Sequence, residues 1–443
     1  MNGRNPLRRS DRFGRSDRSG HSSAANMVRR ISDSSRSYCY AGCGAWQALC
    51  QQLPVVLLLI AITAVSAMPV AAEEYLLEYS VSASQSHDDN INLSPGGVAV
   101  TGAVLAVPVY FTGRSATTSY RVGGEVSTHH YDLEEFDSDN QRIDGEISHK
   151  LEKSSLNAEA SYIRDTTRDS EFLDTGVIGP SAIRREQAKA KFEGTHSLTE
   201  RSGLVAAIEG SDVTYDSNRL SDYEYINSYA GWRFRATGRT EWGLQAGASR
   251  FSSDSGIQSL RSDGISAQGV LDAQLNERVT LSVQSGWIKL ENDVGGAPDA
   301  IDATSDSENS YLFDGSLTYK AERAQWKLAL ISRPSPSGFG VLLNTNRLDA
   351  DYRYRASPRL TFEMSAKVGT QEVQGDSAAL TLSRDRDFFN GSARVALKLN
   401  PRWSLAASYV YRWQDSELFA EEADSNAAFV SVLYEPIMKI WSR

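Results

Sequence analysis

The feature that most constrains this chain is a two-residue alternation of apolar and polar side chains that recurs from about residue 74 to residue 434. Within residues 142–151, for example, Ile143 and Ile147 alternate with Asp144 and Glu146, and residues 347–356 and 360–368 repeat the pattern. Successive side chains of a β-strand point to opposite faces, so each such segment has one apolar and one hydrated face. No long stretch carries the three- and four-residue spacing of a helix, and we therefore predict an all-β protein.

Short turns at regular intervals set the expected number of strands. The turn arginines follow one another at separations of 38, 39, 45, 36 and 43 residues, the length of a hairpin plus a longer loop: Arg201, Arg239, Arg278, Arg323, Arg359 and Arg402. Two earlier turns at 112–115 and 153–155 bring their number to eight. Nine longer acidic connections rich in Ser, Asn and Gly lie between them, near residues 86–97, 132–140, 166–182, 216–222, 253–263, 293–308, 334–340, 372–386 and 415–425. Seventeen connections predict 18 strands, with 16 as the alternative.

An even number of antiparallel strands, with short turns at one end and longer loops at the other, is typical of a bacterial outer-membrane barrel. Only helices and closed barrels satisfy their backbone hydrogen bonds inside a bilayer. Aromatic side chains fall where the membrane interfaces would lie: Trp242, Trp326, Phe362 and Trp403 just after short turns, and Tyr409, Tyr411 and Trp413 on one face of a single segment. We expect a transmembrane antiparallel up-and-down β-barrel in the outer membrane; a soluble β-sandwich is the alternative.

The first 72 residues differ sharply from the rest. They hold nine Arg and three Asp, which leaves 37 Lys plus Arg against 53 Asp plus Glu in the remainder. An apolar core at 54–68, too short to span a bilayer comfortably as a helix, is followed by small residues that would allow cleavage before Glu73. We therefore expect a basic disordered leader plus signal peptide at 1–72 and the barrel at 73–443. An uncleaved anchor helix is the alternative, and translation could start at Met1 or at Met27.

Several function classes are disfavoured. All three cysteines lie in the leader, at Cys39, Cys43 and Cys50, so we expect neither disulfides nor thiolate metal sites in the barrel. An acidic body argues against nucleic acid as a partner. The sequence shows no phosphate-binding glycine loop, zinc-protease motif or nucleophile elbow, and His129 and His130 are adjacent in a strand and point to opposite faces. We expect no cofactor, no metal and no enzymatic activity.

The hydrated register carries the best indication of function. Charges of both signs share it: Arg121, Arg142, Arg233, Arg235, Arg353, Arg355, Arg394, Arg412, Glu125, Asp144, Glu146, Asp349, Asp351 and Glu363. Inside a barrel of 16 to 18 strands such side chains can line an aqueous path and sort ions and anionic sugars by their field. They can equally pair across strands and close the lumen. We favour the path.

Residues 80–95 suggest a family. Asp89, Asn90, Ile91 and Leu93 match the Asp-Asn-hydrophobic-x-Leu entry of a family of outer-membrane β-barrel porins that are encoded with exopolysaccharide and exosortase gene clusters, and the turn-arginine hairpins resemble that family as well. The resemblance covers most of residues 74–434. It implies an outer-membrane barrel connected with polysaccharide secretion more firmly than it implies any transported substance.

Together these observations predict a passive, porin-like conduit linked to exopolysaccharide export. The alternative is a non-conducting barrel that serves as a scaffold or surface-interaction module of a polysaccharide assembly complex. Expected partners are outer-membrane lipid and lipopolysaccharide, the outer-membrane insertion machinery, and polysaccharide with its export proteins. In one respect the sequence departs from outer-membrane proteins that end on an aromatic residue: Trp441 lies several residues beyond the last alternating segment, which ends at Tyr434.

Overall fold

The computed structural model describes residues 74–168, 183–254, 259–295, 304–374, 385–417, 421–436 and 439–442. The chain divides into two units, Met1–Ile62 and Thr63–Arg443, and everything described here belongs to the second. The expected leader and signal peptide at 1–72 lie outside the described residues, so they stay predictions.

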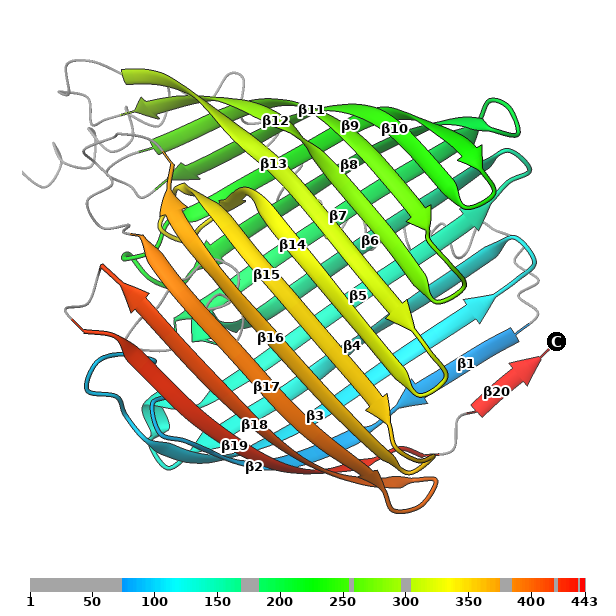
Figure 1. The fold of residues 1–443 in the computed structure, drawn as a ribbon. Helices are drawn as coiled ribbons and strands as arrows, with labels where there is room; N and C mark the ends of the chain where they lie inside the picture. The colour runs from blue at the N-terminus through cyan, green and yellow to red at the C-terminus, as the bar shows by residue number, and fades with distance from the viewer. Residues whose placement is uncertain are drawn as a thin grey trace, which may run out of the picture. The chain divides into compact units, whose positions relative to one another are not determined.

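The second unit is a single curved sheet in which every strand pairs antiparallel with its neighbours (Figure 1). Alternating β-branched, aromatic and small residues with few internal prolines suit long, half-buried strands. The strands are β1 (Glu74–Tyr79), β2 (Val81–Asp88), β3 (Val100–Arg114), β4 (Thr118–Tyr131), β5 (Ser138–Lys150), β6 (Ser154–Thr166), β7 (Arg184–Ser197), β8 (Ser202–Tyr215), β9 (Asp222–Thr237), β10 (Thr240–Asp254), β11 (Ser259–Gln274), β12 (Val279–Gly295), β13 (Thr304–Lys320), β14 (Ala324–Pro336), β15 (Leu342–Arg355), β16 (Leu360–Val373), β17 (Arg386–Lys398), β18 (Trp403–Ser416), β19 (Ala423–Tyr434) and β20 (Lys439–Ser442).

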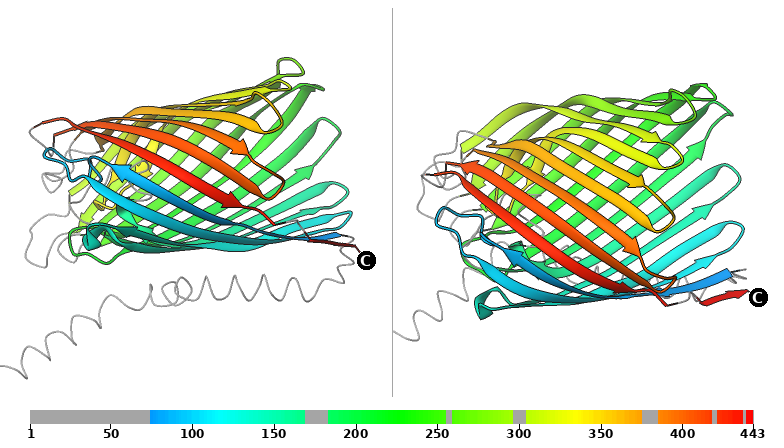
Figure 2. Two further views of the ribbon diagram at one scale, coloured as in Figure 1. Left: turned by 90° about the horizontal axis from the view of Figure 1, so that it is seen from below. Right: turned by 60° about the horizontal axis from the view of Figure 1, so that its bottom comes forward.

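The 20 segments make 18 positions around the sheet, because the first and last strands are each interrupted once. β1 and β2 pair with β3 in one continuous register and are separated only by Ser80, whose backbone N–H donates to the Pro108 carbonyl at 3.2 Å. β19 pairs with β2 and β20 pairs with β1, which closes the cylinder (Figure 2). The register shifts by one residue between these two pairings. The predicted strand number of 18 is confirmed.

The interruption of the last strand changes the interpretation of the C-terminal residues. The sequence pattern ends the strand at Tyr434, but β20 resumes the pairing and places Trp441 opposite Tyr75 of β1. Trp441 therefore lies in the last strand and not beyond it, with 46% of its surface exposed. The alternation missed this because the residues after Tyr434 include a proline and a one-residue register shift, both of which break a two-residue period.

The two ends of the cylinder differ as expected. The eight short turns, at 115–117, 151–153, 198–201, 238–239, 275–278, 321–323, 356–359 and 399–402, lie at one end, called here the turn end. The opposite strand ends, where β2, β4, β6, β8, β10, β12, β14, β16 and β18 finish, form the loop end. Four connections there are fully described, at 89–99, 132–137, 216–221 and 337–341, and each is longer than any of the short turns. Between β10 and β11 only four residues intervene, as in several short turns, so the expected long loop near 253–263 is wrong in length. β1 and β20 lie toward the turn end (Figure 1).

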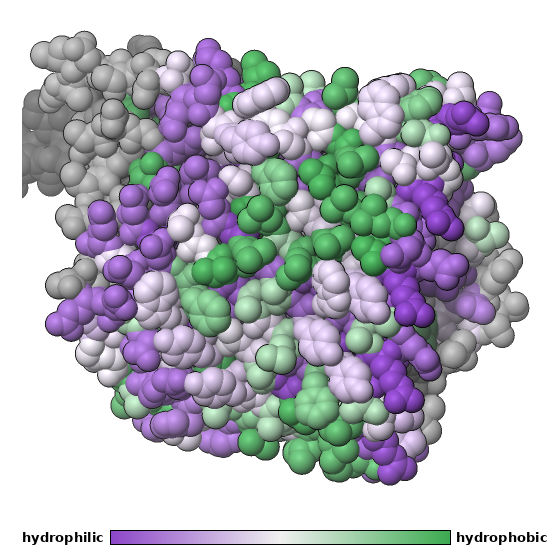
Figure 3. Space-filling model, in the orientation of Figure 1, coloured by the Kyte–Doolittle hydropathy of each residue, from purple (hydrophilic) through white to green (hydrophobic). Residues whose placement is uncertain are grey.

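The outer face is apolar. Ile265 and Trp287 are 73% and 69% exposed, and Trp242 and Phe362 stand on the same face close to the turns, as predicted. On the wall seen in Figure 3, apolar side chains gather across the middle and hydrophilic ones toward the two ends. No helix among the described residues is long and apolar enough to cross a membrane.

In a closed cylinder, the backbone hydrogen bonds of every strand are made to neighbouring strands. The apolar side chains of the outer face can contact lipid without water. The chain is thus an all-β outer-membrane barrel, as the alternation predicted.

Candidate functional site

The inner face of the barrel is identified by following the paired residues around the sheet. Directly paired residues of antiparallel strands share a face, and the resulting assignment stays consistent from β3 through β19 and back to β2. The face that contains Phe251 and Phe388 is the inner one, because these side chains are 1% and 0% exposed and nothing covers the outer face of a one-layer sheet. All 14 charged residues predicted for the lumen lie on this face by register.

The structure brings several of these charges together. Glu363 receives two guanidinium groups, from Arg353 at 2.7 Å and from Arg394 at 3.8 Å. Arg142 contacts Asp144 at 3.0 Å on the same strand. The arginine side chains remain widely exposed, at 62% for Arg353, 46% for Arg394 and 54% for Arg142. Charged groups with this much free surface inside a cylinder need water around them.

Others of the predicted set contact residues that the sequence did not single out. Arg412 pairs with Asp88, Asp349 with Arg347 at 2.9 Å, and Arg235 with Glu241 at 3.9 Å. Arg121 stacks over the Tyr110 ring at 3.8 Å, and Arg233 donates to the Gln245 side chain at 2.7 Å. The rest are placed by register alone: Glu125 faces Arg142, Glu146 faces Arg121, Asp351 faces Lys327 and Arg355 faces Thr361.

At the loop end, one connection folds into the barrel. The loop between β14 and β15 reaches past the four strands β10 to β13, so that the Gly338 carbonyl accepts from the Ser221 backbone N–H at 2.8 Å. The Gly340 carbonyl accepts from the Ser253 hydroxyl at 2.7 Å. Gly340 has φ +78°, and a Cβ there would lie 2.8 Å from the Ser221 hydroxyl, so glycine is required for this approach.

An apolar cluster fixes this loop to the inner wall. Leu342 and Phe339 pack against inner-face side chains of β8, β9, β10 and β12, among them Tyr223, Phe251 and Leu290. The Tyr223 and Phe251 rings are 5.8 Å apart. The barrel is therefore narrowed at the loop end. Two other connections at this end, residues 169–182 and 296–303, lie outside the described residues.

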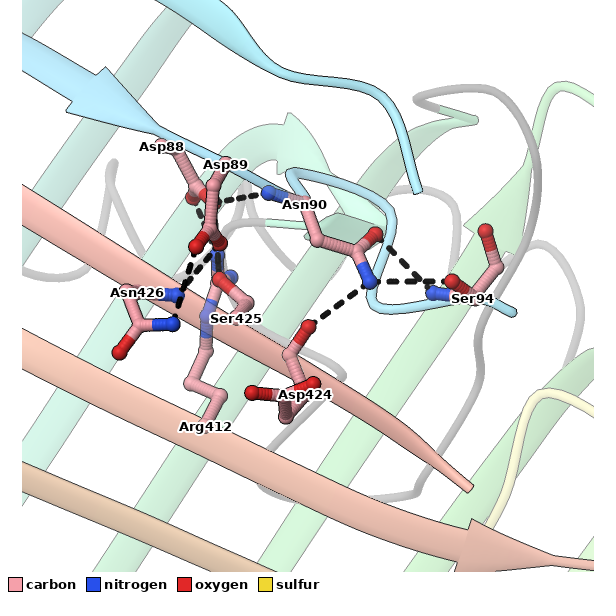
Figure 4. A network of polar contacts seen from close by, with 8 residues as sticks. All are labelled: Asp88, Asp89, Asn90, Ser94, Arg412, Asp424, Ser425 and Asn426. Atoms are coloured by element: carbon pink, nitrogen blue, oxygen red, sulfur yellow. Dashed lines mark hydrogen bonds and ion pairs between the residues drawn. The ribbon is translucent and has the colours of Figure 1, made fainter. Parts of the chain in front are cut away.

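The family-like motif closes the barrel. Asp89 accepts from the Asn426 backbone N–H at 2.7 Å and from the Asn426 side-chain amide at 2.9 Å, across the junction of β2 with β19 (Figure 4). The Asn90 side-chain amide donates to the Asp424 carbonyl at 2.8 Å and to the Ser94 carbonyl at 3.0 Å. These contacts hold the beginning of the sheet to its end.

A buried ion pair lies beneath the motif. The Arg412 guanidinium contacts the Asp88 carboxylate, and the two side chains are 14% and 11% exposed. Asp88 also accepts from the Ser425 hydroxyl at 2.8 Å and from the Asn90 backbone N–H at 3.0 Å (Figure 4). Three donors satisfy one carboxylate, which is the condition under which a buried charge is tolerated.

The rest of the motif turns inward. Ile91 packs with Val100 and Phe136 in a second buried cluster. Leu93 is 1% exposed and has φ +44°, a conformation that an L-residue seldom adopts. Its carbonyl accepts from the Gln414 side chain at 2.6 Å, on the inner face of β18. Asp89, Asn90, Ile91 and Leu93 thus form a closure clasp that joins the strand junction to the lumen.

Comparisons with known proteins add little about function. No protein-family model matches the chain, and no curated protein matches it. Among solved structures, OccK2 (OpdF) of Pseudomonas aeruginosa in complex with glucuronate is 12% identical, with a TM-score of 0.42 over 82% of this chain and 98% of that one. A BenF-like porin from Pseudomonas fluorescens is 11% identical, with a TM-score of 0.41 over 82% and 99%. OccAB2 of Acinetobacter baumannii is 11% identical, with a TM-score of 0.40 over 83% and 98%. Similarity this low says nothing about what this barrel binds or conducts.

Proposed function

We propose that the barrel is a passive conduit for hydrophilic solutes. The observation that carries the proposal is the wide exposure of the Arg142, Arg353 and Arg394 side chains on the inner face. Desolvating an arginine is costly, so these groups imply a water-filled space on their side of the wall. A lumen lined by charges of both signs passes hydrated solutes and needs no covalent chemistry to do so.

The narrow part of the proposed path lies at the loop end, beside the Ser337–Val341 loop. There the Ser221 N–H and the Ser253 hydroxyl donate to loop carbonyls beside a cluster of aromatic side chains. These groups are buried, so they hold the loop in place, and the solute would meet the charged part of the inner face. The resemblance of the motif at Asp89–Leu93 supports exopolysaccharide as the cargo class.

Two further partners follow from the outer surface. Arg250 contacts Asp263 at 2.6 Å on the outer face at the loop end, where the phosphate-bearing headgroups of lipopolysaccharide would lie. The β20 segment with Trp441 pairs along the closing junction and offers the insertion machinery an aromatic residue in the last strand. The alternative function, a non-conducting scaffold for polysaccharide assembly, is favoured by one observation: the packed clusters at the loop end.

Conductance in planar lipid bilayers separates the two functions. We expect refolded protein to show stable open channels, and Gly340→Val to raise the single-channel conductance because a side chain there expels the loop from Ser221 and Ser253. Gly238→Val is the matched control, since a Cβ at this turn meets nothing within 4 Å. A wild-type barrel that folds, as judged by heat-modifiable gel migration, and yet carries no current contradicts the conduit.

A further inference from the structure

The charges on the inner face are not evenly distributed. Four adjacent strands, β14 to β17, carry nine basic side chains on it: Lys327, Arg333, Arg347, Arg353, Arg355, Lys367, Arg386, Arg394 and Lys398. Only three acidic side chains accompany them, Asp349, Asp351 and Glu363. This cationic wall, β14 to β17, has a formal surplus of six positive charges.

The opposite side of the barrel is balanced. β6 and β15 are nine positions apart in a cylinder of 18, so β5 to β8 face the cationic wall. Their inner face holds five basic side chains and six acidic ones: Arg142, Lys150, Arg185, Lys189 and Lys191, with Asp144, Glu146, Glu159, Asp165, Glu193 and Glu209. The lumen therefore has one strongly positive side.

The acids within the cationic wall do not neutralise it. Glu363 is shared by Arg353 and Arg394, and Asp349 pairs with Arg347. Lys327, Arg355 and Lys398 are exposed on the same face. The surplus is also opposite in sign to the chain as a whole, whose formal net charge is −10. The positive charge of this wall is thus not a consequence of overall composition.

We propose that the cationic wall makes the conduit selective for anions and binds carboxylate- or sulfate-bearing saccharides along β14 to β17. Guanidinium groups bind carboxylates and sulfates through paired hydrogen bonds, while exposed lysines add attraction without fixed geometry. Low-dielectric walls concentrate the field across the lumen and raise the local concentration of anions. The proposal rests on the conduit function and narrows its cargo to acidic glycans.

The test uses refolded full barrel in two assays. Calorimetry measures binding of trigalacturonate, with maltotriose as the neutral oligosaccharide of the same length. The reversal potential under a potassium chloride gradient measures selectivity. The triple variant Lys327→Gln/Arg355→Gln/Lys398→Gln removes three charges from the cationic wall. The variant Lys150→Gln/Lys189→Gln/Lys191→Gln removes three from the balanced wall and is the control.

We expect trigalacturonate to bind and maltotriose not to, chloride to be the more permeant ion, and the first variant to weaken trigalacturonate binding about tenfold and to shift the reversal potential toward zero. The control variant should do neither. Equal effects of the two variants, or a wild-type channel that prefers potassium, overturn the proposal. A barrel that binds trigalacturonate but carries no current contradicts the conduit and leaves the anion site standing; one that does neither contradicts both.

Discussion

The loop end and the turn end of this barrel share one inner face, but the side chains on that face are buried at the loop end and exposed toward the turn end. At the loop end, the inner-face residues Phe251 and Leu290 are each 1% exposed, in the cluster that holds the inward loop between β14 and β15, and Phe388 is 0% exposed. Toward the turn end, inner-face residues such as Arg353 keep more than half of their side-chain surface free. The difference shows that strand register decides which way a side chain points, while the loops decide whether it meets water.

The largest loss of stability is expected for Phe251→Ala, at the buried loop end. Phe251 packs against Tyr223, Leu290 and the inward loop, so the truncation leaves a cavity that its neighbours can only partly fill. We expect a loss of about 4 kcal/mol in the free energy of unfolding, measured by urea unfolding of the barrel in lipid vesicles.

The control for this variant lies near the turn end of the same face. Gln325→Ala removes an exposed inner-face side chain and should change the free energy of unfolding by no more than about 0.5 kcal/mol. If both variants lose the same amount, the loop end is not packed as described.

Two ion pairs, one buried at the loop end and one exposed on the inner face, allow the same comparison of buried and exposed side chains. Arg412→Ala leaves the Asp88 carboxylate buried without its cation, and we expect a cost of about 3 kcal/mol. Arg142→Ala breaks the exposed contact with Asp144 and should cost less than about 1 kcal/mol. Both free energies are measured by denaturant unfolding. The dependence of the free energy on denaturant concentration should be the same for the variants and the wild type.

A second change distinguishes a lost ion pair from lost packing. Adding Asp88→Asn to Arg412→Ala removes the unpaired charge and should recover part of the stability. No recovery would mean that Arg412 acts by filling space and not by its charge.

The smallest expected effect concerns pH at the loop between β4 and β5. The Tyr131 backbone N–H at 2.7 Å and the His130 ring hold the pKa of Asp137 below its ordinary value. A carboxyl with a lowered pKa in the folded state contributes stability above its unfolded pKa, about 3.9, and this contribution is lost as the pH falls through the folded value.

We therefore expect a slight decrease in barrel stability as the pH is lowered below about 4, seen as a lower midpoint of thermal unfolding. Asp137→Asn should flatten this dependence relative to wild type. Identical pH profiles for the two proteins would show that other carboxyls account for all of it.

Much of the fold could be predicted because its rules are local. Alternation along each strand and the turn arginines predict 18 strands, the two kinds of connection and the outward position of Trp242 and Phe362, and the structure confirms all of these. Each depends on residues within one hairpin. The function of the charged inner set stays a prediction, since register places side chains without showing what passes them.

What could not be predicted depends on contacts between distant residues. Tyr223 and Val213 share the register of the lumen charges, so alternation assigns them to the hydrated face. They are buried because they belong to a cluster that includes Leu342, more than a hundred residues later in the chain. The sole local signal was the run of prolines and glycines near 334–340, which marked a loop but not its direction.

The motif at Asp89–Leu93 could be recognised by its resemblance to a family, but its contacts across the closing junction could not be predicted. Asp89 and Asn90 show no helical or strand period, and their partners Asn426 and Asp424 lie at the far end of the sequence. Nothing in a single sequence connects the two regions, because closure of a barrel is a property of the whole sheet.

The closure clasp has a consequence for the order in which the strands of this barrel can pair during folding. Apart from the two closing pairings, β2 with β19 and β1 with β20, every strand pairs with one a few tens of residues away, whereas Asp89 and Asn426 are 337 residues apart. Contacts so remote form late, because the intervening chain must already be ordered before they become favourable. Until β19 arrives, the growing sheet has two bare edges that any other strand could join. We therefore expect the contacts between Asp89 and Asn426 to form late in assembly, when β19 pairs with β2.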